Sequence, residues 1–200
     1  MQIYFEENGH ILSLPWSPEM TLPSAILWID LLKPTPEEER AAEKLLGMPI
    51  PTREEMNEIE VSNRLYEEKG ALFMTATMLT KVDSGEPQTH AVTFIVTEKM
   101  LFTVRYLDTT SFRRFSTHFQ KIAPMNLDGP SIFLMMIESI INRQADILER
   151  VERDIDRITR TIFRHREQGE RAPATDYQAI LEWIGRCGDI TAKIHESLTT

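Results

Sequence analysis

The chain has 200 residues, of which 42% are hydrophobic, and it carries a formal net charge of −9 at pH 7. This composition suits a folded domain with one core of ordinary size and excludes intrinsic disorder. The acidic charge argues against a nucleic-acid partner, because phosphate-tracking surfaces need clustered lysines and arginines. The single cysteine, Cys187, excludes an internal disulfide and a cysteine-based zinc site, and we expect it only to pack.

Short apolar runs separated by turn residues predict a sheet in the first half of the chain. Asn8-Gly9 lies between two such runs and is a hairpin signal. The run 25–31 is apolar almost throughout, as in a strand that is buried on both faces. We expect mainly antiparallel pairing among the predicted strands, which are 2–5, 11–14, 25–31, 61–66, 71–80, 90–97 and 100–106.

Two capping boxes mark helix starts in the same region. Thr35 and Glu38 open a helix that should end at Gly47, and Thr52 with Glu55 opens a short helix. A further helical pattern covers 109–122, with three phenylalanines on one side.

A long helix is predicted from Pro130 to about His165, and a second from about Thr175. Apolar residues step by threes and fours along both, so the two helices should pair antiparallel with a coiled-coil tendency. The predicted seam of the first helix is Phe133, Ile137, Ile140, Gln144, Ile147, Val151, Ile155, Ile158 and Ile162. The predicted face of the second is Tyr177, Ile180, Leu181, Ile184, Cys187, Thr191, Ile194 and Leu198.

The predicted fold class is therefore α/β, with helices packed on a mixed, largely antiparallel sheet and followed by a long antiparallel helical hairpin. We place the α/β domain at 1–125 and the hairpin at 126–200. The longest apolar run, 132–137, is far too short to span a bilayer, and the N-terminus has no signal-peptide pattern. We thus expect a chain that does not itself cross a membrane.

Motifs for catalysis are missing from the sequence. The five histidines are far apart, no glycine-rich phosphate loop is present, and no serine has an elbow motif around it. We expect no enzyme activity.

Most acids of the long helix have arginines at helical spacing, but Glu138 has no basic residue three or four positions before it. A carboxylate beside an apolar seam needs a partner, which can be a cation, an arginine from elsewhere or a proton.

Three stretches resemble the cytoplasmic part of the CorA-like magnesium transporter family. They are Trp28-Ile29-Asp30-Leu31 with Pro34-Thr35-Pro36-Glu37-Glu38, the segment 58–67, and the pattern from Phe133 through Glu149 to Asp156. The family's Gly-Met-Asn signature and its two C-terminal membrane helices are not among the 200 residues. The resemblance implies that the pore and a stalk helix lie beyond Thr200.

The resemblance also implies a homopentameric channel at the cytoplasmic face of the inner membrane, whose soluble part senses Mg²⁺. Relatives act on Co²⁺, Ni²⁺ or Zn²⁺ as well. The positions that match the family's sensing carboxylates, at the interface with a neighbouring subunit, are Glu54, Glu55 and Glu138. Magnesium prefers hard oxygen ligands and keeps several waters, so a few carboxylates give the weak binding that suits sensing.

Two other interpretations stay open. Helix capping alone accounts for Glu55, and a place in the first turn of a helix accounts for Glu54. The long helices could also serve a soluble scaffold or interaction module that pairs with a partner helix and has no role in transport.

Overall fold

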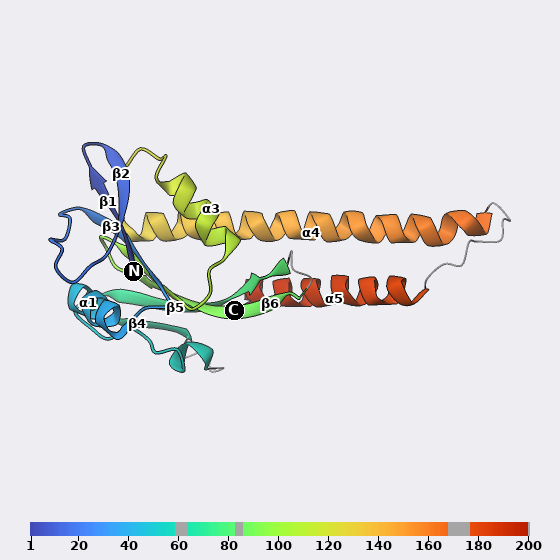
Figure 1. Cartoon of the computed structure of the whole chain (residues 1–200), viewed down its shortest axis with the longest axis horizontal. Coiled ribbons are helices and arrows are strands. Elements are labelled where there is room, and N and C mark those ends of the chain that lie inside the picture. The colour runs from blue at the N-terminus through green and yellow to red at the C-terminus, as the bar shows by residue number, and fades with distance from the viewer. Residues whose placement is uncertain (59–63, 83–85, 168–176, 200) are drawn as a thin grey trace.

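The computed structural model describes residues 1–58, 64–82, 86–167 and 177–199, with side chains described outside 161–177. A sheet lies at one end of the molecule, and two long helices project from it side by side (Figure 1). The mixed sheet and the antiparallel hairpin confirm the predicted fold class.

One sheet of seven strands contains all the strands of the described residues, in the order β2-β1-β3-β7-β6-β5-β4. β3 and β7 are parallel, and every other neighbouring pair is antiparallel. Asn8 and Gly9 have φ of 53° and 78°, as a tight hairpin turn requires. The strands are β1 (Gln2–Glu7), β2 (His10–Pro15), β3 (Ile26–Leu32), β4 (Leu65–Glu68), β5 (Ala71–Thr80), β6 (Gln88–Val96) and β7 (Leu101–Arg105).

Helix α1 (Pro36–Leu46) and the short 3₁₀ helix η1 (Glu55–Asn57) lie over one face of the sheet. The predicted capping box of α1 is present: the Glu38 amide donates to the Thr35 hydroxyl at 3.3 Å, and the Thr35 amide donates to the Glu38 carboxylate at 3.0 Å. Gly47 ends the helix with φ of 80°. Ala42 and Met56 are buried against Ile29 and other residues of this face.

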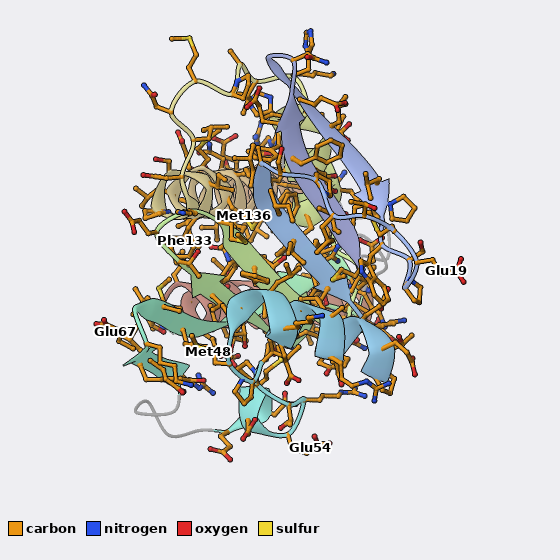
Figure 2. All side chains as sticks on the ribbon, turned by 90° about the vertical axis from the view of Figure 1, so that its left-hand side faces the viewer. Glu19, Met48, Glu54, Glu67, Phe133 and Met136 are labelled. Carbon is orange, nitrogen blue, oxygen red and sulfur yellow. The ribbon has the colours of Figure 1, made fainter. Side chains whose placement is uncertain are left out.

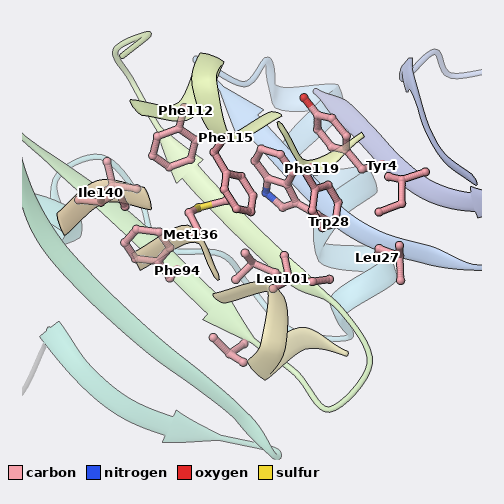
Figure 3. Close-up of a cluster of buried hydrophobic side chains, with 14 of the residues drawn as sticks. Tyr4, Leu27, Trp28, Phe94, Leu101, Phe112, Phe115, Phe119, Met136 and Ile140 are labelled. Atoms are coloured by element: carbon pink, nitrogen blue, oxygen red, sulfur yellow. The ribbon is translucent and has the colours of Figure 1, made fainter. Parts of the chain in front are cut away.

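The opposite face carries α3 (Thr110–Phe119) and the first turns of α4 (Gly129–Glu167) over an aromatic cluster (Figure 3). Trp28 lies at its centre, stacked on Tyr4 with ring centroids 4.2 Å apart. The rings of Phe115 and Phe119 meet the Trp28 indole edge-on at 5.4 and 5.9 Å. Met136 of α4 is completely buried there. The first turns of α4 therefore belong to the hydrophobic core on this face of the sheet, which we call the sheet core.

A buried ion pair joins the two parallel strands. Arg105 of β7 donates from Nε and Nη2 to the two carboxylate oxygens of Asp30 on β3, at 2.9 and 2.7 Å. Thr103 donates to the same carboxylate at 2.8 Å and accepts from the Trp28 indole N–H at 3.0 Å. The Arg105 guanidinium lies 4.4 Å from the centroid of the Phe112 ring. Each charge is thus compensated where water is excluded.

Gly129, the first residue of α4, lies against the β6–β7 turn. A Cβ atom at this position would be 2.1 Å from the carbonyl oxygen of Thr97 and 2.6 Å from that of Met100. Only glycine permits this close approach of two backbones.

The outer part of α4 pairs with α5 (Tyr177–Thr199) in the hairpin. One row of apolar side chains, which we call the seam, packs the two helices against each other. It is formed by Leu79, Ile147, Val151, Cys187, Ile190 and Ile194. Cys187 packs in this seam, as expected, and burial raises the pKa of its thiol.

The prediction of which α5 residues contact α4 is wrong in part. Leu181, Ile184 and Leu198 are exposed by 69%, 48% and 54%, while Trp183 and Ile190, which were not predicted, face α4. The helix carries two apolar stripes, and periodicity alone does not decide which one meets α4. Ile155 of α4 is likewise 45% exposed, and the predicted seam residue Ile162 lies outside the described side chains.

Candidate functional site

Glu54 and Glu55 lie on the segment that enters η1. Thr52 donates to the Glu55 carboxylate from its amide at 2.8 Å and from its hydroxyl at 3.0 Å, while the Glu55 amide donates back to the hydroxyl at 3.3 Å. Met56 is 2% exposed and anchors the segment to the sheet. The predicted capping box is present, and Glu55 is therefore committed to a structural role through one carboxylate oxygen.

Glu54 is exposed and belongs to an acidic surface around Tyr106. Partial burial raises the pKa of the Tyr106 hydroxyl, and the charges of Glu39 and Glu54 raise it further. Partial burial and the neighbouring Glu43 raise the pKa of Glu39. Arg53 offsets this negative charge in part, with its guanidinium 5.2 Å from the centroid of the Tyr106 ring. A cation at this surface would relieve the repulsion between the carboxylates.

Glu138 lies on α4, at the rim of a pocket of about 320 Å³ between α3 and α4. The pocket has mixed charge: Arg114 and His118 contribute from α3, and Asp146 contributes from α4. Arg114 Nη1 lies 3.8 Å from an oxygen of Asp146. Arg143 of α4 lines the same pocket, so Glu138 shares it with basic residues of both helices.

Glu138 also borders an exposed apolar row on α4. Leu134, Ile141, Leu148 and Ile155 are spaced by seven residues and are exposed by 65%, 48%, 37% and 45%. At helical spacing, Glu138 falls between Leu134 and Ile141 on the same side of the helix. The sequence interpretation missed this row; its seven-residue spacing was the available signal.

One chain does not bring the three predicted metal ligands together. Glu54 and Glu55 lie on the face covered by α1, and Glu138 lies on the face covered by α3 and α4. Figure 2 shows Glu54 on one side of the sheet and Phe133 and Met136 of α4 on the other. Within residues 1–58, 64–82, 86–167 and 177–199, no group of three or more His, Cys, Asp or Glu side chains is arranged to hold a metal ion.

Solved structures share this fold. The soluble domain of CorA from Methanocaldococcus jannaschii superposes with a TM-score of 0.60 at 14% identity, covering 100% of this chain and 91% of that one. The full-length CmaX protein gives a TM-score of 0.66 at 10% identity, covering 99% of this chain and 59% of that one.

Residues 23–182 match the model of the family described as CorA-like Mg2+ transporter protein. The chain belongs to this family. The magnesium transport protein CorA of Wolinella succinogenes is 28% identical over 207 residues, which cover 99% of this chain and 61% of that protein. The chain therefore spans about three fifths of the length of that relative.

In the described part of the chain, every helix is too short or too polar to cross a bilayer.

Proposed function

We propose that the chain is the cytoplasmic, ion-sensing part of a CorA-like transporter of Mg²⁺ or of another divalent cation such as Co²⁺, Ni²⁺ or Zn²⁺. In this proposal the α/β domain and the hairpin regulate a pore formed by other residues, at the cytoplasmic face of the inner membrane, and perform no catalysis. Family membership supports it, together with one structural observation: Glu54 and Glu138 lie at the surface on opposite sides of the molecule.

Opposite placement suits a site between subunits. An ion shared by Glu54 and Glu138 requires two chains, and each chain then offers one side to each neighbour. A head-to-tail contact of this kind closes into a ring when the rotation permits, and a homopentamer is one such ring. A partner that covers the exposed row from Leu134 to Ile155 would bury apolar surface and place Glu138 in the interface.

The chemistry follows from charge. Without the ion, facing carboxylates repel each other, and the interface is weakened. With the ion, the repulsion becomes attraction through shared oxygen ligands and waters, which gives the weak affinity suited to a sensor. The cation then selects between two arrangements of the ring.

Sedimentation velocity in millimolar MgCl₂, against NaCl of equal ionic strength, tests this proposal. We expect Mg²⁺ to promote association and to raise the melting temperature of the chain. The variants Glu54→Gln and Glu138→Gln should each lose this response. Glu19→Gln should keep it, because Glu19 is an exposed acid that Figure 2 shows far from Glu54. Equal responses in all four proteins would contradict the proposal.

The exposed heptad row favours a second candidate, a scaffold whose long helices pair with a partner helix. Association that is independent of Mg²⁺ and is abolished by Ile141→Glu would support the scaffold. Ile141 points away from the core and is 48% exposed, so this change should leave the fold intact.

A further inference from the structure

A second pocket, which we call the apolar pocket, lies where strands β4, β5 and β6 meet the first turns of α4. Its volume is about 440 Å³, within the range of small-molecule sites. None of Glu54, Glu55 and Glu138 lines it. Its large apolar side chains are Leu72, Met74, Val96, Phe133 and Leu134.

The pocket exposes apolar surface because α4 covers only part of this face of the sheet. Val96 belongs to the sheet core, and Met74 and Phe133 pack against it. Leu72 lies two residues before Met74 on β5 and therefore points to the same face. Leu72 and Leu134 are nevertheless 38% and 65% exposed. A ligand that covered these side chains would remove apolar surface from water, which is favourable.

Two carboxylates border this apolar surface. Glu67 of β4 and Glu98 of the β6–β7 turn line the pocket, and both are exposed. Neither carboxylate forms an ion pair or a side-chain hydrogen bond with the described residues. Lys69 and Lys99, from the same two turns, line a separate hollow beside α1, which Glu98 also borders. The charge that complements the apolar pocket is therefore positive.

The strand register places the apolar lining between the two carboxylates. Glu67 is opposite Leu72 on β5, and Leu72 is opposite Val96 on β6. Adjacent strands are about 5 Å apart, so Glu67 is about 10 Å from the strand that leads to Glu98. Figure 2 shows Glu67 and Phe133 on the same side of the molecule. A complementary ligand has a cationic group at each end and an apolar chain between them.

We propose that the apolar pocket binds a linear aliphatic diamine or polyamine. Its terminal ammonium groups would contact Glu67 and Glu98, and its methylene groups would cover Leu72, Val96 and Phe133. The buried methylene groups supply most of the affinity, and the two charge-assisted contacts select a ligand with two cationic ends.

The bound amine would connect parts of the chain that are far apart in sequence. Glu67 belongs to β4, Glu98 follows β6, and Phe133 belongs to α4, so one ligand would contact all three. It would stabilise this end of the sheet, because the pocket exists only when the three elements are together. The effect does not require a divalent cation, and it therefore stands or falls separately from the proposed ion sensing.

A titration followed by amide NMR, without divalent cations and at constant ionic strength, tests the proposal. Octanediamine should bind about fivefold or more tightly than octanediol, because two ammonium groups meet two carboxylates. Octylamine should fall between them. Ethylenediamine should bind more weakly than octanediamine, because it has no chain to cover the apolar lining. The shifted amides should include those of Leu72 and Val96.

The double variant Glu67→Gln/Glu98→Gln should bind octanediamine no more tightly than octanediol, while its affinity for octanediol stays unchanged. Leu72→Thr should weaken the binding of both ligands. Glu68→Gln is the matched control and should bind as the wild type does, because Glu68 is an exposed acid of β4 that pairs with Lys69 and does not line the pocket.

Three results would overturn the proposal. The first is equal affinity of the wild type for octanediamine and octanediol, and the second is an unchanged preference for octanediamine in the double variant. The third is association of the chain without any ligand, measured by sedimentation velocity and abolished by Leu72→Thr, which would show that a second copy covers the pocket.

Discussion

The sheet core and the hairpin seam are built differently, although α4 runs through both. In the sheet core, Trp28 is surrounded by aromatic side chains from several elements. Its own strand, β3, is hydrogen-bonded to β7. In the seam, one row of aliphatic side chains on α4 meets one row on α5 and the end of β5. The first is a layered core, and the second is a narrow contact between two helices that only the end of β5 extends.

The difference teaches where stability resides. A side chain with neighbours on all sides contributes to global unfolding, whereas a seam that is one residue wide can open while the sheet stays folded. We therefore expect the hairpin to be the less stable unit.

The largest effect is expected at the buried ion pair between β3 and β7. Asp30→Ala leaves Arg105 buried without its partner and should lower the free energy of unfolding by about 3–5 kcal/mol. Urea denaturation followed by circular dichroism measures this loss. The double variant Asp30→Leu/Arg105→Met removes both charges and should recover most of the stability. If Asp30→Ala cost less than the double variant, the pair would not be the anchor of the sheet core.

Two isoleucines on α4 give a matched pair, because Ile140 belongs to the sheet core and Ile147 to the hairpin seam. They are 8% and 3% exposed. Ile140→Ala should lower the global free energy of unfolding by about 3 kcal/mol, and Ile147→Ala by about 2 kcal/mol.

Hydrogen exchange separates the two variants more sharply than stability does. Ile147→Ala should accelerate exchange of the amides of α5 while those of β3 and β7 stay protected, because the seam opens locally. Ile140→Ala should accelerate exchange in the strands as well. Identical exchange patterns in the two variants would show that the sheet and the hairpin unfold as one unit.

A smaller effect, of opposite sign, is expected at Gln144 in the seam. Its Nε2 donates to the Ser197 hydroxyl at 2.7 Å, but its buried Oε1 has no partner among the described residues. Gln144→Met should stabilise the chain by about 1 kcal/mol, since an unsatisfied buried acceptor is removed. Gln144→Glu should destabilise it, because it buries a charge there. A melting curve for each variant tests this, and a lower melting temperature for Gln144→Met would refute it.

The smallest effect is a pH dependence at His90 on β6. Partial burial lowers the pKa of this imidazole, and the charges of Lys81 and Arg53 lower it further. The folded chain therefore favours neutral His90. Its contribution is fully present above the ordinary histidine pKa of about 6.5 and is lost as pH falls through the lowered value.

His90→Gln should consequently reduce the drop in melting temperature between about pH 7 and pH 5. His10→Gln serves as control, because His10 is exposed. An unchanged drop in His90→Gln would exclude this histidine as a source of the pH dependence.

Local features of the fold could be predicted from the sequence because their causes are local. Thr35, Gly47 and Thr52 set helix ends through their own backbone and near neighbours, and Asn8-Gly9 sets a turn in the same way. The helical spacing of apolar residues predicted the two long helices. The start of the predicted strand 61–66 lies outside the described residues and stays a prediction.

Features that depend on distant segments could not be predicted. Leu181 was assigned to the wrong face because α5 has two apolar stripes, and the buried one is the stripe that packs against α4 and the end of β5. The capping role of Glu55 was predicted, but the separation of Glu54 from Glu138 depends on which face of the sheet each helix covers, and no local pattern encodes that. The roles of Glu54, Glu55 and Glu138 as ion ligands stay predictions.

The contact at Gly129 gives α4 the mechanics of a lever. The helix is 39 residues long, or about 58 Å, and its first residue is pressed against the β6–β7 turn. A tilt of about 5° at this fulcrum displaces the far end by about 5 Å. A small change of tilt at the sheet would therefore move the far end of α4 by several ångströms, and a bulkier residue at position 129 would displace the start of the helix.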